Sequence, residues 1–217
     1  MRCLVALALF CGAALGAPAA PQGDLAGRVQ AWLDSWSRLA GTFEQRLASP
    51  TLPSEQVETG RFEIIRPDRM RWDYVTPEEK LAVTDGVHTW LYVPSDRLVI
   101  RGRVDALRDD SAISLLLSGA LRLDEAFEVK STAIIGLEAR LDLVPRRVSE
   151  NIQEIHLRCD PVSGRVFGFE VNDAADNRVR WRLEDIQIDP AIDENRFTFE
   201  VPRGVEIQDI DDSVDLP

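Results

Sequence analysis

Hydrophobic residues recur with two different periods along the chain, and the first period is helical. Between residues 24 and 39 they return every three to four positions, which places them on one face of a helix. Asp24 suits the start of this helix as a cap, and Gly41 suits its end. We therefore expect a helix over 24–39 that packs its apolar face on a sheet. The residues of this face are Leu25, Val29, Trp32, Leu33, Trp36 and Leu39.

From residue 60 onward, apolar and polar residues alternate, which is the period of a strand with one buried face. Turn signals such as Asp85–Gly86 and residues 161–164 separate the alternating stretches. We expect about ten or eleven antiparallel strands in one sheet, enough to curl strongly or nearly close. The buried faces are predicted to carry Phe62, Ile64, Met70, Trp72 and Tyr74, then Leu137, Ala139, Leu141 and Leu143, then Ile155 and Leu157, then Phe167, Phe169 and Val171, then Val179, Trp181 and Leu183, and finally Phe197, Phe199 and Val201.

One segment interrupts the strand pattern. Residues 110–119 are short and apolar, with capping residues before them and a glycine at their end. This segment predicts a short helix with Ile113, Leu116 and Leu117 facing inward. No linker, repeat or shift in composition divides the remaining chain, so 20–217 are expected to form a single domain.

The first residues predict export. Met1-Arg2 is a short positive region, and an apolar run follows over 3–15. This run is shorter than the about 20 residues needed to span a membrane, and small residues after it suit a signal peptidase. We therefore expect a signal peptide over 1–19, with cleavage after Ala19 or, alternatively, after Gly16.

The cysteines leave little room for disulfide or thiol chemistry. A lipid-modified Cys11 is disfavoured because Phe10 stands where such sites need a small residue. Removal of the signal peptide leaves Cys159 as the one cysteine, so no internal bridge can form. Ile155, Leu157 and Cys159 stand at every second position and so share one face of a strand. Cys159 is therefore predicted to be a buried apolar side chain.

Charge disfavours two classes of partner. The 217 residues carry 37 Asp and Glu against 25 Lys and Arg, a formal net charge of −12. Such a chain lacks the excess of cations that would neutralise nucleic-acid phosphates or hold it on an anionic membrane. We expect neither nucleic acid nor a membrane surface as a partner.

Motifs for catalysis are absent. The sequence contains no Gly-x-Ser-x-Gly, no phosphate-binding Gly-Lys-Ser/Thr loop, no His-Glu-x-x-His and no Cys-x-x-Cys. His88 and His156 have no second His or Cys at ligand spacing, so they are expected at the surface. We therefore predict no catalytic residue, no metal site and no cofactor.

One charged residue falls on an apolar face. Counting by two from Phe62 and Ile64 places Arg66 on the buried side, although Pro67 can disturb this parity. The side chain can lay its stem along the sheet edge and reach water, or it can point inward. An inward guanidinium requires acceptors, because an unpaired buried charge costs several kcal/mol. With no acidic residue suitably placed, backbone carbonyls at the end of a helix would serve.

The stretch around Arg66 also resembles a known family. The run Gly60–Tyr74, with Arg66-Pro67 at its centre, is similar to the signature of the LolA family, periplasmic carriers of outer-membrane lipoproteins. The similarity continues at Pro77, Asp85–Gly86, Trp90–Tyr92, Pro94, Asp176–Asn177 and the predicted last strand within Phe197–Val205.

This resemblance implies an incomplete, strongly curved antiparallel β-barrel, with the N-terminal helix and the inserted helix as a lid over an apolar cavity. Arg66 matches the family's characteristic arginine, which implies a latch that hydrogen-bonds the lid backbone in the closed form. Acyl chains would separate the lid from the barrel and break these bonds. The residues expected to line the cavity are Trp32, Trp36, Phe62, Ile64, Trp72, Ile113, Leu116, Leu117, Leu141, Phe167 and Phe169.

The resemblance also implies the function and the partners. The protein would be a monomer that shelters the acyl chains of lipoproteins between an inner-membrane ABC-type exporter and an outer-membrane acceptor. ATP hydrolysis would belong to the exporter, which agrees with the absence of a nucleotide motif. The strand around Met70 is expected to be the edge that docks these partners.

Other functions stay open from the sequence. A carrier of another lipid or a glycolipid would have the same features. A sensor with the same fold would use the cavity to detect mislocalised lipids or a partner peptide. A lipid-handling enzyme would require an acidic residue buried beside Arg66.

Overall fold

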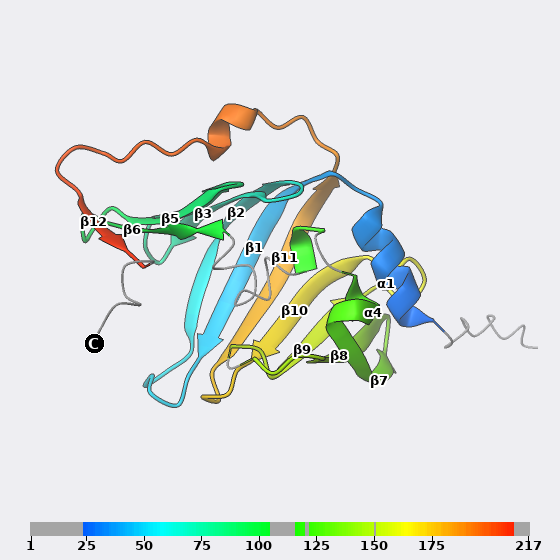
Figure 1. Cartoon of the computed structure of the whole chain (residues 1–217). Coiled ribbons are helices and arrows are strands. Elements are labelled where there is room, and N and C mark those ends of the chain that lie inside the picture. The colour runs from blue at the N-terminus through cyan, green and yellow to red at the C-terminus, as the bar shows by residue number, and fades with distance from the viewer. Residues whose placement is uncertain (1–23, 105–115, 120–121, 150, 211–217) are drawn as a thin grey trace, which may run out of the picture.

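The computed structural model describes residues 24–104, 116–119, 122–149 and 151–210. The predicted signal peptide and most of the predicted helix over 110–119, including Ile113, lie outside these residues. In the described parts, strands follow one another along the chain, and helical pieces lie at their start and between them (Figure 1).

Twelve strands of the described chain form one sheet, in the order β12-β6-β5-β4-β3-β2-β1-β11-β10-β9-β8-β7. All pairings described are antiparallel except that of β12 with β6. The mainly antiparallel β fold is therefore confirmed, whereas its curvature into a half-barrel stays a prediction. The strands are β1 (Arg38–Ala48), β2 (Gln56–Ile65), β3 (Arg69–Thr76), β4 (Lys80–Asp85), β5 (His88–Val93), β6 (Leu98–Arg103), β7 (Phe127–Ile135), β8 (Glu138–Pro145), β9 (Glu154–Cys159), β10 (Val166–Asn172), β11 (Arg178–Ile188) and β12 (Glu206–Asp209).

Helices α1 (Leu25–Asp34) and α4 (Leu123–Ala126) lie beside the end of the sheet formed by β7 to β10 (Figure 1). A third helical piece, η1 (Glu194–Phe197), is a single 3₁₀ turn between β11 and β12. None of the helices in the described chain has the length and apolar character to cross a membrane.

Helix α1 is shorter than predicted. Asp24 caps its start by accepting a hydrogen bond from the Gly27 N–H at 2.8 Å, as expected. Its end, however, lies at Asp34, where both the backbone N–H and the hydroxyl of Ser35 donate to the last turn. The prediction that the helix runs to residue 39 is wrong, because β1 begins at Arg38 and includes Leu39 and Gly41.

A single apolar core joins α1 to one face of the sheet. Phe43, Trp72 and Trp181 meet at its centre, with ring centroids 5.0 to 5.4 Å apart. Cys159 is fully buried in this core together with Ile155 and Leu157, as the alternation predicted. Such aromatic burial supplies much of the apolar area that stabilises a fold without a disulfide.

Two residues of the predicted buried faces lie elsewhere. Leu137 is 92% exposed, because it belongs to the tight turn between β7 and β8 rather than to a strand. Phe167 lies on the polar face, under the guanidinium of Arg158. A β-bulge in β10 between Val166 and Gly168 shifts the alternation by one residue, so the preceding and following buried positions are three apart.

The predicted strand around Phe197 and Phe199 is also wrong. Asp193 accepts a hydrogen bond from the Asn195 N–H at 3.0 Å, and the chain turns there into η1. Phe197 is buried in a separate small cluster with Ile65. The last strand, β12, begins only at Glu206.

Candidate functional site

Arg66 lies in the turn between β2 and β3 and reaches under the end of α1. Its Nε donates to the Leu117 carbonyl oxygen at 3.1 Å, and its Nη1 donates to the Trp36 carbonyl oxygen at 3.2 Å. Nη1 also donates to the carbonyl oxygen of Leu33, in the last turn of α1. The guanidinium thus points inward, and its acceptors are backbone carbonyls at a helix end, which is the inward alternative that the strand parity left open.

The surroundings of Arg66 favour a cation. The Arg66 Cζ lies 3.5 Å from the centroid of the Trp36 ring, a cation–π contact. The end of a helix also carries partial negative charge, which attracts the guanidinium. Burial lowers the pKa of Arg66 to about 10, and the Asp34 carboxylate opposes that shift. The side chain is therefore charged at neutral pH.

We call α1 with the two residues that follow it, Ser35 and Trp36, together with residues 116–119, the lid. Leu116 and Leu117 are buried in the same core as α1, at 5% and 1% exposed. Gly119 follows with a φ of +74°, and a β-carbon there would lie 2.9 Å from Cδ and Nε of Arg66. This glycine leaves the space that Arg66 occupies, a role that its sequence position did not indicate.

Two further contacts hold the lid. The side chain of Gln30, only 8% exposed, accepts a hydrogen bond from the Leu123 N–H at 2.7 Å and donates to Asp34 at 2.8 Å. Gly164, in the turn between β9 and β10, lies so close to α1 that a β-carbon there would be 2.3 Å from the carbonyl of Arg28. Sequence reasoning missed both positions.

Most of the residues predicted to line a cavity come together under the lid. They share one buried core and are 0% to 7% exposed. Among the described residues of this set Phe167 is the exception, because the bulge in β10 turns it to the other face; Ile113 lies outside the described residues. The residues brought together are Trp32, Trp36, Phe62, Ile64, Trp72, Leu116, Leu117, Leu141 and Phe169.

Met70 does not mark a docking edge. Its side chain is 4% exposed and belongs to the core. Moreover, β3 has a hydrogen-bonded neighbour on each side, β2 and β4, so it lies inside the sheet. The outermost strands of the described sheet are β7 and β12.

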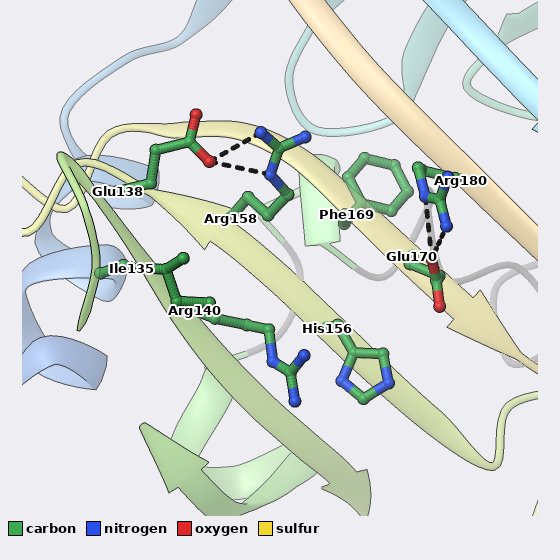
Figure 2. A pocket seen from close by; sticks show the side chains of 9 residues that line it. Ile135, Glu138, Arg140, His156, Arg158, Phe169, Glu170 and Arg180 are labelled. Atoms are coloured by element: carbon green, nitrogen blue, oxygen red, sulfur yellow. Dashed lines mark hydrogen bonds and ion pairs between the residues drawn. The ribbon is translucent and has the colours of Figure 1, made fainter. Parts of the chain in front are cut away.

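A hollow of about 270 Å³ lies on the opposite, polar face of the sheet, over β8 to β11 (Figure 2). Arg158 pairs with Glu138 there at 2.6 Å, and Arg180 pairs with Glu170 at 2.7 Å. An acyl chain in this hollow would cover charged side chains and remove their water, so the hollow is unsuited to one.

A buried carboxylate lies beside this hollow. Asp142 is 4% exposed; burial would raise its pKa, but hydrogen bonds from Arg140, Ser131 and His156 outweigh that effect and lower the pKa to about 2. The His156 Nδ1 lies 2.6 Å from the Asp142 carboxylate. The His156 side chain is 17% exposed, so it is half-buried and paired rather than free at the surface, as had been predicted.

Neither metal binding nor thiol chemistry has support in the described chain. Within it, no three His, Cys, Asp or Glu side chains gather as metal ligands would. Burial raises the pKa of the Cys159 thiol to about 11, so the reactive thiolate is disfavoured.

Comparison with known proteins identifies one family. The sequence model described as outer membrane lipoprotein carrier protein LolA matches residues 34–200. An outer-membrane lipoprotein carrier protein of Halorhodospira halophila is 32% identical over 191 residues, which cover 86% of this chain and 88% of that protein. One from Pseudomonas aeruginosa is 28% identical over 197 residues, covering 89% and 93%.

A solved structure supports the fold. An uncharacterized conserved protein from Thermus thermophilus superposes with a TM-score of 0.52 at 11% identity, covering 86% of this chain and 97% of that one. At this identity, the likeness concerns the arrangement of strands and helices alone.

Proposed function

The chain belongs to the LolA family of outer-membrane lipoprotein carrier proteins, and from that premise we propose that it shelters the acyl chains of lipoproteins between its lid and its sheet. The family is periplasmic and consists of transport proteins rather than enzymes. We also propose that residues 1–19 are the signal peptide that directs export and that 20–217 form the carrier domain.

Solvation of the cargo explains why a carrier is needed. Exposing an acyl chain to water costs about 0.8 kcal/mol per methylene. Three chains of about fifteen methylenes each approach roughly 35 kcal/mol on this scale, so free diffusion through the periplasm would be negligible. The core under the lid supplies the apolar side chains that acyl chains require, with Phe62, Trp72 and Leu141 among them.

One observation carries the proposed mechanism: Arg66 holds the lid through three backbone carbonyls. Acyl chains inserted between the lid and the sheet would break these bonds. A hydrogen bond to a charged group is worth about 1.5–3 kcal/mol, so the loss lowers the net affinity for cargo. Moderate affinity allows a membrane receptor to take the cargo over.

The partners follow from this direction of transfer. We propose that an inner-membrane ABC-type exporter loads acylated lipoproteins and that an outer-membrane acceptor removes them, with the carrier acting as a monomer. ATP hydrolysis then belongs to the exporter. The carrier itself contributes binding energy and a lid that opens and closes.

The test is a release assay with the purified protein. Proteoliposomes that contain the exporter and a labelled triacylated lipoprotein are incubated with the protein and ATP, and the soluble fraction is analysed. We expect a soluble one-to-one complex that passes its lipoprotein to outer membranes. Lipoprotein that stays in the proteoliposomes, while the protein takes up another lipid or none, would contradict the proposal and favour a different lipid cargo or a sensor.

A further inference from the structure

Three buried hydrogen-bond donors gather at Arg66 without an acceptor. They are the indole Nε1 groups of Trp32 and Trp36 and the Nη2 group of Arg66, none of which has a hydrogen-bond partner in the described chain. The two indole side chains are 7% and 3% exposed. Their ring centroids are 5.9 Å apart, and Arg66 lies over the ring of Trp36, so the three side chains form one contiguous group.

Unpaired donors are unusual in such a place. A buried indole N–H normally finds an acceptor, because water cannot replace the lost hydrogen bond. The side chain of Gln30, on the same helix as Trp32, by contrast bonds both the Leu123 N–H and the Asp34 carboxylate. The three donors at Arg66 thus remain available for acceptors that a ligand brings.

The acceptors that Arg66 already has indicate what this other partner is. All three are carbonyl oxygens, from Leu33, Trp36 and Leu117. Separation of the lid from the sheet removes them and leaves the guanidinium charged in an apolar place. Fatty-acyl groups carry acceptors of the same kind, at the ester or amide that joins each chain to its head.

We propose that Trp32, Trp36 and Arg66 form a binding subsite for the carbonyl oxygens of the cargo's fatty-acyl groups. In the loaded form these carbonyls replace the lid carbonyls on Arg66, and the two indole N–H groups donate to further carbonyls. The subsite rests on the proposed function. It adds that the protein recognises the ester or amide linkages of the acyl chains as well as their hydrocarbon.

The test compares two probes that differ only at the carbonyls. One is a synthetic lipopeptide with two palmitoyl ester chains, and the other is its dihexadecyl ether counterpart. We expect the protein to bind the ester form at least about tenfold more tightly, because only its carbonyls can accept hydrogen bonds from Arg66 and from the two indole N–H groups. Trp32→Phe and Trp36→Phe should each weaken ester binding about three- to tenfold and weaken ether binding clearly less, because the ether has no carbonyl for the indole N–H to bind.

Trp90→Phe is the matched control. Trp90 lies on β5 beside Phe199, away from the lid, and its loss should change the binding of neither probe. A second measurement needs no substitution: the indole ¹H–¹⁵N signals of Trp32 and Trp36 should move downfield with the ester probe and stay in place with the ether probe.

The outcomes separate the subsite from the proposed function. Equal binding of both probes, with no selective shift of the two indole signals, would overturn the subsite and leave a lipid carrier in place. Binding of neither probe would overturn the proposed function itself. The same ester and ether pair built on phosphatidylcholine identifies the source of the carbonyls, because an ester preference there supports a subsite that also accepts phospholipids.

Discussion

The side chain of Arg66 fills the space that a side chain on residue 119 would occupy. A β-carbon on Gly119 would lie 2.9 Å from Cδ and Nε of Arg66. The latch therefore depends on two residues far apart in the sequence, one that supplies the guanidinium and one that leaves room for it.

Gly119→Ala should therefore weaken the latch. The backbone at residue 119 has a φ of +74°, where alanine is strained, and the new methyl group would displace Arg66 from the Leu117 carbonyl. We expect a loss of about 1–3 kcal/mol in the free energy of unfolding, measured in urea. Gly136→Ala is the control, because Gly136 has a φ of +64° and no neighbouring atom within 4 Å. An equal loss in both variants would mean that the contact with Arg66 contributes nothing.

Removal of the guanidinium should trap the cargo. Without the bonds from Arg66 to the lid carbonyls, cargo no longer has to break them, so its net affinity rises. Arg66→Leu should load lipoprotein from exporter proteoliposomes but transfer several-fold less of it to outer membranes than the wild type. Arg158→Leu, on the polar face, should transfer normally. Normal transfer by the Arg66 variant would contradict the latch.

Gly164→Ala should loosen α1 from the sheet. A β-carbon at this position would lie 2.3 Å from backbone atoms of Arg28, and backbone cannot move aside as a flexible side chain can. Together with a φ of +73°, this predicts a loss of about 2–4 kcal/mol in the free energy of unfolding. Gly204→Ala shares the positive φ without a close neighbour and should cost clearly less. Equal denaturation midpoints for the two variants would refute the close approach.

Two neighbouring phenylalanines should differ sharply. Phe169 is 1% exposed and stacks with Trp181, so Phe169→Ala should cost about 3–5 kcal/mol of stability. Phe167 lies on the polar face under Arg158, so Phe167→Ala should cost about 1 kcal/mol or less. Thermal unfolding of the two variants tests the bulge in β10 directly. The opposite order would mean that the alternation runs through residue 167 unbroken.

The Asp142 carboxylate should make stability fall in acid. Its pKa of about 2 in the folded protein lies below the ordinary value of 3.8, so its contribution is complete above about pH 5 and is lost as the pH falls through 3.8 toward 2. This contribution is at most about 2 kcal/mol. Urea unfolding between pH 2 and 5 should show the wild type losing its advantage over Asp142→Asn across this range. A difference that does not change with pH would contradict the shift.

The alternation of residues was enough to predict the sheet. For Arg66 the parity of one strand left two orientations open, and the resemblance to the LolA family favoured the inward one, in which burial requires an acceptor for the cation. The same alternation predicted that Cys159 is buried, and its side chain is 0% exposed in the core. These features are local, so a single sequence contains them.

Features that depend on contacts distant in the sequence could not be predicted in this way. The start of β1 soon after α1 is fixed in part by Asp189, which accepts hydrogen bonds from the N–H groups of Ser37 and Arg38 at 2.9 Å. The bulge that turns Phe167 outward has no signal in its own residues. The roles of Gly119 and Gly164 follow only once Arg66 and α1 are in place.

The pairing of β1 with β11 has a consequence for the order in which the chain folds as it is synthesised. Leu39, near the start of the domain, faces Ile188, near its end, in the ladder that joins the two runs of strands. Contacts of such long separation form late in folding. Since synthesis proceeds from the N-terminus, β1 can pair early with β2 but must wait for nearly the whole chain before its other partner, β11, exists. Until β11 has been made, the runs β12–β1 and β11–β7 therefore cannot join into one sheet, and the core that spans both runs stays incomplete.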